Sequence, residues 1–126
     1  MPGRNKTGNV LVEKSVYDPP SKEDGTRILV MRIWPRGVKK ERVDIWMRDL
    51  GTEKDLIKEW KAGKLDLGEF RKRYLAGLDN SERRALIEQI AGIAKHGRNV
   101  TLLCSDKDPE RCHRSFLKEL VDKSLK

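Results

Sequence analysis

The segment that starts at Arg32 reads Arg-Ile-Trp-Pro-Arg and places two guanidinium groups on either side of an aromatic ring. A guanidinium group binds a carboxylate or a phosphate through two parallel hydrogen bonds. Trp34, between the arginines, offers a ring that can stack on a base. This spacing predicts a site where Arg32 and Arg36 neutralise an anionic ligand. The structural alternative is that both arginines form ion pairs with Asp18 and Asp106, since charged residues make up 38% of the chain.

A second candidate site surrounds Cys112, which is flanked by Arg111, His113 and Arg114. Nearby positive charges and a helix N-terminus both lower the pKa of a thiol, so Cys112 is a candidate catalytic or redox-sensing residue, together with His113. Adjacent residues of a helix point in different directions, however, which disfavours a nucleophile–base pair. The structural alternative places Cys112 in the core and holds His113 by a hydrogen bond.

The sequence predicts no metal ion and no cofactor. A zinc site would need Cys104, Cys112, His113 and His96, and neighbouring helix residues rarely bind one metal ion together. The glycine-rich dinucleotide motif, the Walker A motif and the His-Glu-x-x-His motif are all absent from the sequence.

Three short segments, 10–16, 27–33 and 100–104, have the composition of strands and are bounded by turn residues. Segment 27–33 is apolar on both faces in its middle, which predicts helices on both sides of that strand. Apolar spacing predicts helices over 43–50, 52–62, 66–78, 81–97 and a last segment after Asp108. Thr52 and Asp66 are the predicted N-caps of the second and third helices. The spacing also predicts that Trp46, Met47 and Trp60 pack in the core.

This order predicts an α/β fold, with a small, mostly parallel sheet flanked by helices, in a single domain over 10–126 that follows a flexible basic tail over 1–9. A long helical connection implies that strands 27–33 and 100–104 are parallel. Residues that follow parallel strands meet at one edge of the sheet, where ligands bind. The candidate ligand-binding residues that follow the strands are Tyr17, Arg32, Trp34, Arg36, Ser105, Arg111 and Arg114.

Specific roles follow from these positions. Tyr17 or Trp34 would stack on the ligand, and Asp18 would act as hydrogen-bond acceptor or general base. Arg114 and the N-terminus of the last helix would complete the anion site.

The 28 Lys and Arg residues exceed the 20 Asp and Glu residues by 8, which favours acidic partners such as nucleic acids, nucleotides or phosphorylated metabolites. No apolar run is long enough to span a membrane, and we expect no membrane partner. Two cysteines do not make a disulfide framework, which favours a cytoplasmic location. The abundance of charged residues is typical of thermophilic sources.

Several motifs resemble those of the short members of the domain-of-unknown-function 488 (DUF488) family, over about residues 10–121. The matching motifs are Tyr17-Asp18-Pro19-Pro20, Asp24-Gly25-x-Arg27, Arg32-x-Trp34-Pro35-Arg36-Gly37, Glu69-Phe70-Arg71, Arg73-Tyr74, Leu102-Leu103-Cys104 and Cys112-His113-Arg114. The resemblance implies an α/β fold. Other short members replace the segment 112–114, so the resemblance favours Tyr17, Asp18, Arg32, Trp34 and Arg36 as site residues.

Three functions therefore remain as hypotheses. The leading one is a domain that binds, or acts on, a nucleotide, nucleic acid or other phosphorylated ligand at the carboxyl edge of the sheet. The second is a non-enzymatic basic module that binds DNA or RNA through its surface charge. The third is a thiol-dependent enzyme or redox sensor that uses Cys112.

Overall fold

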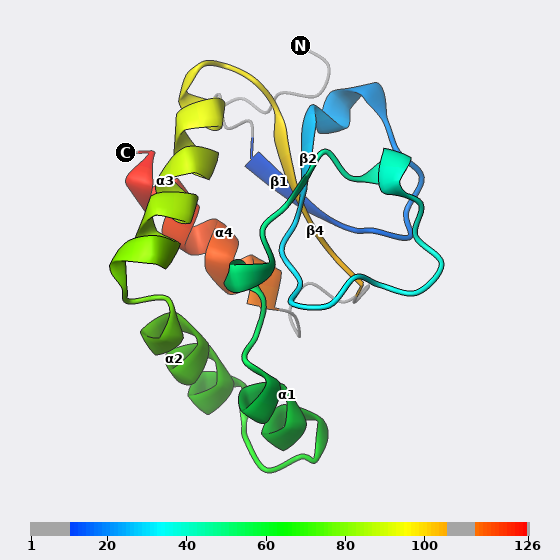
Figure 1. The fold of residues 1–126 in the computed structure, drawn as a ribbon. Coiled ribbons are helices and arrows are strands. Elements are labelled where there is room, and N and C mark those ends of the chain that lie inside the picture. The colour runs from blue at the N-terminus through cyan, green and yellow to red at the C-terminus, as the bar shows by residue number, and fades with distance from the viewer. Residues whose placement is uncertain (1–10, 106–112, 126) are drawn as a thin grey trace.

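The computed structural model describes residues 11–105 and 113–125 and confirms the predicted α/β fold (Figure 1). Its strands are β1 (Leu11–Ser15), β2 (Thr26–Leu29), β3 (Ile45–Trp46) and β4 (Val100–Cys104). Its α-helices are α1 (Lys54–Lys61), α2 (Leu67–Gly77), α3 (Ser81–Lys95) and α4 (His113–Ser124). Within these residues, no helix is long and apolar enough to cross a membrane.

The four described strands form one parallel sheet in the order β1-β4-β2-β3. Strand β4 lies between the other two long strands, with Leu102 opposite Glu13 on one side and Ile28 on the other. Because every pairing is parallel, all strands end at the same edge of the sheet. The chain leaving β1, β2 and β4 therefore emerges at this carboxyl edge.

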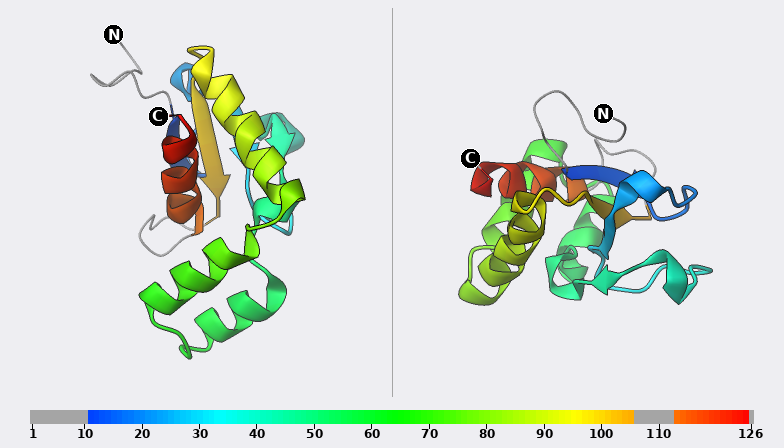
Figure 2. Two further views of the ribbon diagram at one scale, coloured as in Figure 1. Left: turned by 90° about the vertical axis from the view of Figure 1, so that its left-hand side faces the viewer. Right: turned by 90° about the horizontal axis from the view of Figure 1, so that it is seen from above.

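One face of the sheet packs on the helices. The alternate strand residues Ile28, Val100 and Leu102 belong to an apolar cluster that also contains side chains from all four helices. Helices α3 and α4 lie side by side against this face (Figures 1 and 2). The hydrophobic core of the molecule therefore lies between the sheet and the helices.

The other face is covered by loops, which differs from the prediction of helices on both sides of segment 27–33. Leu29 and Leu103 point to this face and form a smaller cluster with Val16. The residues packed against it, including Trp34 and Val38, come from the connection between β2 and β3. Burial alone makes a strand apolar on both faces, and loop side chains bury Leu29 as completely as a helix would.

The helix predicted over 43–50 is wrong. This segment contains β3 and a single 3-10 turn, and Trp46, predicted as a core residue, is exposed. The segment pairs with the edge of β2 instead, because the Asp44 and Met47 amides donate to the carbonyls of Arg27 and Leu29. The apolar residues of this segment are spaced at helical intervals, but its backbone is extended. Pairing of the backbone with a free sheet edge competes with helix formation.

The helices predicted over 52–62, 66–78 and 81–97 are present as α1, α2 and α3, with ends that differ by at most two residues. Helix α4 lies in the segment predicted after Asp108, whose first residues fall outside the described chain. Asp66 caps α2 by accepting from the Glu69 amide at 2.7 Å, as its sequence predicts. Helix α3 is capped by Asn80. The N-cap residue of α1 is Glu53, and no described side chain caps this helix, so the prediction that Thr52 caps it is wrong. Thr52 precedes the N-cap residue.

Candidate functional site

A cleft of about 820 Å³ opens at the carboxyl edge of the sheet. The residues that follow the strands form one side of it, and α1 and the start of α2 form the other. Cys104 and Ser105, at the end of β4, lie between these two walls together with His113, the first residue of α4. Enzymes with open parallel sheets place their ligands at this position.

The first wall is the segment 31–36, which leaves the end of β2. Trp34 is held in it by a hydrogen bond from its indole nitrogen to the Val38 carbonyl at 2.8 Å and by an edge-to-face contact with Trp46. The Tyr17 hydroxyl donates to the Arg36 carbonyl at 2.8 Å and joins the chain after β1 to this wall. The wall is therefore tied to its neighbours at both Trp34 and Arg36.

The second wall is built from α1 and α2. Trp60 stacks on Phe70 with ring centroids 4.6 Å apart and planes 7° from parallel. Arg73 donates two hydrogen bonds to the Glu59 carboxylate, at 2.8 and 3.1 Å, and these hold the pKa of Glu59 below its usual value. An aromatic stack and an ion pair thus fix α1 against α2.

A close backbone approach joins the two walls at Gly51. A Cβ atom added to Gly51 would lie 2.2 Å from the Arg32 nitrogen, so only glycine fits there. The Arg32 guanidinium donates to the Thr52 carbonyl at 3.3 Å and to the Glu53 carboxylate at 3.2 Å. The start of α1 is consequently held beside the end of the first wall.

The charge that lines the cleft is positive. Arg32, Arg36, Lys54 and Lys61 line it, and no aspartate or glutamate does so among the described residues. Arg32 pairs with Glu53, whereas the other three cations form no salt bridge within 11–105 and 113–125. Lys54 and Lys61 are seven residues apart on α1, so both lie on one face of that helix. Positive charges on both walls favour an anion in the space between them.

Comparison with known proteins identifies the family. The model of the DUF488-N3a family, described as the active DUF488-N3 subclade, matches residues 11–125. The chain belongs to this family. The resemblance to DUF488 proteins predicted from the sequence motifs is therefore confirmed.

Curated relatives of this DUF488-N3a protein occur in Escherichia coli and Mycobacterium tuberculosis. The uncharacterized protein YeaO of Escherichia coli (strain K12) is 39% identical over 106 residues, which cover 82% of this chain and 90% of YeaO. The uncharacterized protein Rv3073c of Mycobacterium tuberculosis (strain ATCC 25618 / H37Rv) is 33% identical over 110 residues, or 85% and 89% of the two chains. No solved structure gives a significant match.

The structure brings most of the predicted ligand-binding residues to the cleft. The predicted ligand-binding residues that line it are Tyr17, Arg32, Trp34, Arg36 and Ser105. The candidate catalytic residue His113 lines it as well. His113 is 6% exposed, and its Nε2 donates to the carbonyl of Val30. A hydrogen bond therefore holds its ring, as the structural alternative for His113 predicted. The position of a residue in the lining is observed, and its contact with a ligand is still a prediction.

Two predicted residues lie outside the lining. Asp18 belongs to the turn after β1, where its carboxylate accepts from the Ser15 amide at 3.3 Å. Arg114 is 2% exposed and directs its guanidinium to Glu13 of β1 at 3.1 Å and to the Cys104 carbonyl at 3.5 Å. Arg114 faces β1 because its helix packs on that strand. Both side chains are engaged by the protein itself.

Part of the second sequence-predicted site falls outside the described residues. Arg111 and Cys112 lie there, as does Asp106, the predicted partner of the arginines. Cys104 is buried at 5% exposure. Among the described residues, no group of three or more His, Cys, Asp or Glu side chains could hold a metal ion.

Most of the second wall was not predicted from the sequence. Lys54, Lys61 and Phe70 were not singled out for the site, and Trp60 was predicted only as a core residue. A signal was present in α1, because Lys54 and Lys61 share a helix face with the apolar Ile57. That pattern is common on solvated helices, so it indicates a ligand site only when another wall faces it.

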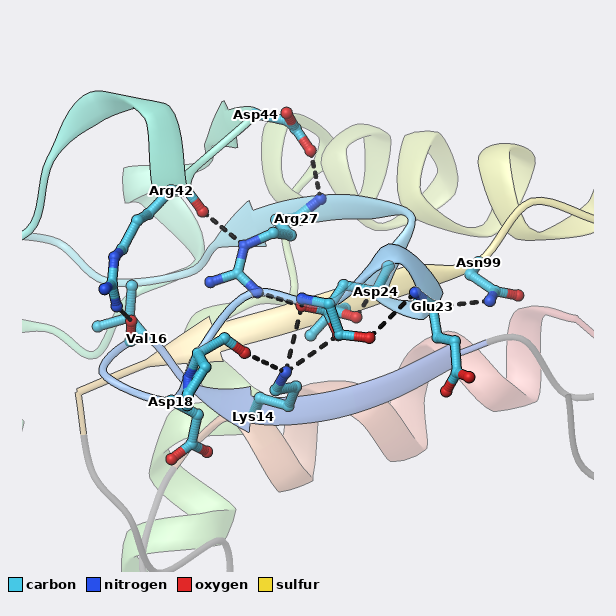
Figure 3. Close-up of polar contacts among 12 residues, drawn as sticks. Lys14, Val16, Asp18, Glu23, Asp24, Arg27, Arg42, Asp44 and Asn99 are labelled. Carbon is cyan, nitrogen blue, oxygen red and sulfur yellow. Dashed lines mark hydrogen bonds and ion pairs between the residues drawn. The ribbon is translucent and has the colours of Figure 1, made fainter. Parts of the chain in front are cut away.

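A second concentration of charge is the Asp24 cluster of Lys14, Asp24 and Arg27 (Figure 3). None of these three residues lines the cleft. Asp24 precedes β2 and is 4% exposed. Lys14 donates to its two carboxylate oxygens at 3.1 and 3.2 Å, and Arg27 donates to one of them. The cluster therefore joins β1 to β2 across the loop-covered face of the sheet.

Backbone groups complete the Asp24 cluster. The Ser21 amide donates to the Asp24 carboxylate at 3.0 Å, and the Thr101 hydroxyl of β4 donates to the Asp24 carbonyl at 2.8 Å. Burial raises the pKa of the carboxyl, but hydrogen bonds from the Ser21 amide and the two cations outweigh it and hold this pKa below its usual value of 3.8. Asp24 is thus an ionised structural residue.

Proposed function

We propose that this DUF488-N3a protein binds a small anionic ligand, a nucleotide or another phosphorylated compound, in the cleft at the carboxyl edge of its sheet. The observation that carries the proposal is the set of cations Arg36, Lys54 and Lys61, which line one cleft and have no carboxylate partner among the described residues. Like charges repel each other, and a bound anion would relieve that repulsion.

The shape of the cleft supports a small ligand. Its volume of about 820 Å³ lies within the range of sites that hold metabolites and cofactors. A module that binds nucleic acid by surface charge needs an extended basic surface and no enclosed space. Concave walls that carry both cations and aromatic rings therefore favour the leading hypothesis over the basic module.

The proposal is tested by thermal unfolding with phosphate, pyrophosphate and a series of nucleotides. A ligand that binds only the native state raises the melting temperature. We expect at least one of these anions to raise it for the natural protein. The variants Arg36→Gln and Lys61→Gln should each reduce that increase, because each removes one positive charge from a different wall.

The matched control is Lys95→Gln. Lys95 is an exposed lysine at the end of α3 that does not line the cleft. It should lower the overall charge by the same amount and leave the ligand effect intact. If none of the anions raises the melting temperature, or if Lys95→Gln reduces the effect as much as Lys61→Gln does, the proposed site is wrong.

A further inference from the structure

The start of α1 combines several groups that suit a phosphate. Thr52 lines the cleft at 2% exposure, and its hydroxyl oxygen has no hydrogen-bond partner among the described residues. Lys54, the first residue of the helix, also lines the cleft and forms no ion pair with any described residue. A buried hydroxyl without a partner is costly, so a ligand group that accepts its hydrogen bond would be favoured at this position.

The backbone at the same place adds further donors. No side chain of the described residues caps α1, and its first amide groups have no partner within the helix. Arg32 lies beside them, since its guanidinium reaches the Thr52 carbonyl. Amide groups, the Thr52 hydroxyl and Lys54 thus gather at one end of the cleft, beside an Arg32 guanidinium that also pairs with Glu53. The helix dipole there also favours negative charge.

The aromatic rings of the cleft lie farther along the same helix. Trp60 follows Lys54 by six residues, or about 9 Å at 1.5 Å per residue along the axis. Its stacking on Phe70 fixes the plane of its ring, and Trp34 belongs to the opposite wall. Inorganic phosphate would use none of these rings. A ligand that uses both ends carries an anion at one end and a flat group at the other.

We infer that the cleft takes a nucleoside monophosphate, whose phosphate binds Thr52 and Lys54 at the start of α1 and whose base packs against Trp60. This inference rests on the proposed function and specifies its ligand. The base supplies a flat surface that stacks on an aromatic ring whatever its identity. The phosphate supplies oxygens that accept from the hydroxyl and the free amides.

The test is isothermal titration calorimetry with the four ribonucleoside 5′-monophosphates, the corresponding nucleosides, inorganic phosphate and a single-stranded oligonucleotide. We expect at least one monophosphate to bind at least about tenfold more tightly than both its nucleoside and phosphate, because it alone reaches both ends of the cleft. Thr52→Val should lower the affinity for this monophosphate by about tenfold, which is the scale of one hydrogen bond to a charged group. The same variant should leave binding of the nucleoside unchanged.

Thr101→Val is the matched control. Its hydroxyl donates to the Asp24 carbonyl away from the cleft, so its removal should lower the melting temperature and leave the affinity for the monophosphate unchanged. Thr52→Val should leave the melting temperature unchanged and weaken the binding of the monophosphate. The reason is that the Thr52 hydroxyl has no hydrogen-bond partner to lose within the described chain. The two variants thus separate a ligand contact from a structural contact.

The possible failures are distinguishable. If phosphate binds as tightly as every monophosphate, or if the oligonucleotide binds more tightly than all of them, this inference is wrong while the proposed anion site stands. An unchanged affinity of Thr52→Val for the monophosphate would overturn the placement of the phosphate. If neither phosphate nor any nucleotide binds, the proposed function fails together with the inference.

Discussion

The Asp24 cluster and the cleft both concentrate charge beside the same parallel sheet, but they use it in opposite ways. In the cluster, the carboxylate of Asp24 is surrounded by Lys14, Arg27 and the Ser21 amide. In the cleft, Lys54 and Lys61 face one space without a carboxylate partner among the described residues. Charges that are neutralised within the chain stabilise the fold, whereas charges left without a partner are available to a ligand.

This difference implies that stability and ligand binding reside in different residues. Removing a partner from the cluster leaves buried charges without compensation. Removing a cation from the cleft relieves repulsion and costs the fold little. Substitutions that change stability without changing ligand binding, or the reverse, therefore test this difference.

The largest effect is expected for Asp24→Asn. The amide removes the negative charge that Lys14 and Arg27 share, and we expect the free energy of unfolding to fall by about 3 kcal/mol. Arg36→Gln, in the cleft, should change it by less than about 0.5 kcal/mol. Urea denaturation of both variants measures the difference. Equal effects of the two substitutions would contradict the division between cluster and cleft.

A smaller loss is expected for Gly51→Ala, which acts on the junction between the two cleft walls. The added methyl group would meet the backbone of Met31 and Arg32, and overpacking of this kind costs about 1–3 kcal/mol. Ligand binding should weaken as well, because Arg32 and the start of α1 are displaced. Gly77→Ala is the matched control, since nothing lies within 4 Å of a Cβ atom at Gly77. Calorimetry and thermal unfolding report the two effects separately.

The pH dependence of stability should identify the Asp24 cluster. The folded-state pKa of Asp24 lies below its usual value of 3.8, so the folded protein binds fewer protons than the unfolded chain does between these two values. The stabilisation is therefore complete above about pH 5 and is lost as the pH falls through the folded-state pKa. Urea denaturation across this range should show a shallower decline for Asp24→Asn than for the natural protein. Identical slopes would show that Asp24 is not the group responsible.

The smallest effect is expected for Tyr17→Phe. This substitution removes the hydrogen bond from the Tyr17 hydroxyl to the Arg36 carbonyl and keeps the ring in the cleft. Because Tyr17 is 44% exposed, water can replace the lost donor, and we expect the free energy of unfolding to fall by about 0.5 kcal/mol. Thermal unfolding measures this loss. Titration with phosphate, pyrophosphate and the nucleotides shows whether the ring itself contacts the ligand. A loss as large as that of Asp24→Asn would mean that the first wall is part of the stable core.

Much of the fold was predictable because its signals are local. Short apolar segments between turn residues located β1, β2 and β4, and the long helical connection implied that β2 and β4 are parallel. The segment around Trp46 was not predictable in this way, because its helical spacing is also compatible with pairing to the edge of β2. Whether this segment becomes a helix or a strand depends on whether the edge of β2 is free. No local sequence pattern shows whether that edge is free.

The candidate site divides along the same line. Parallel strands predicted that Tyr17, Arg32 and Trp34 would meet at one edge, and they do line one cleft. The same argument also brought Arg114 to that edge, where the structure instead directs its guanidinium to Glu13. Position after a strand determines the edge at which a residue lies, but the neighbouring elements determine where its side chain points.

The amino-acid sequence by itself determined the parallel α/β fold and the edge of the sheet at which polar side chains converge. The order of strands and helices along the chain and their hydrophobic periodicity are properties of the chain alone. Only the tertiary structure decided which charges are paired. Arg32 meets Glu53 across 21 positions and Arg114 meets Glu13 across 101 positions, while Lys54 and Lys61 meet no carboxylate in the described chain. The physical reason is that electrostatic attraction depends on distance in space, which folding sets independently of distance along the chain.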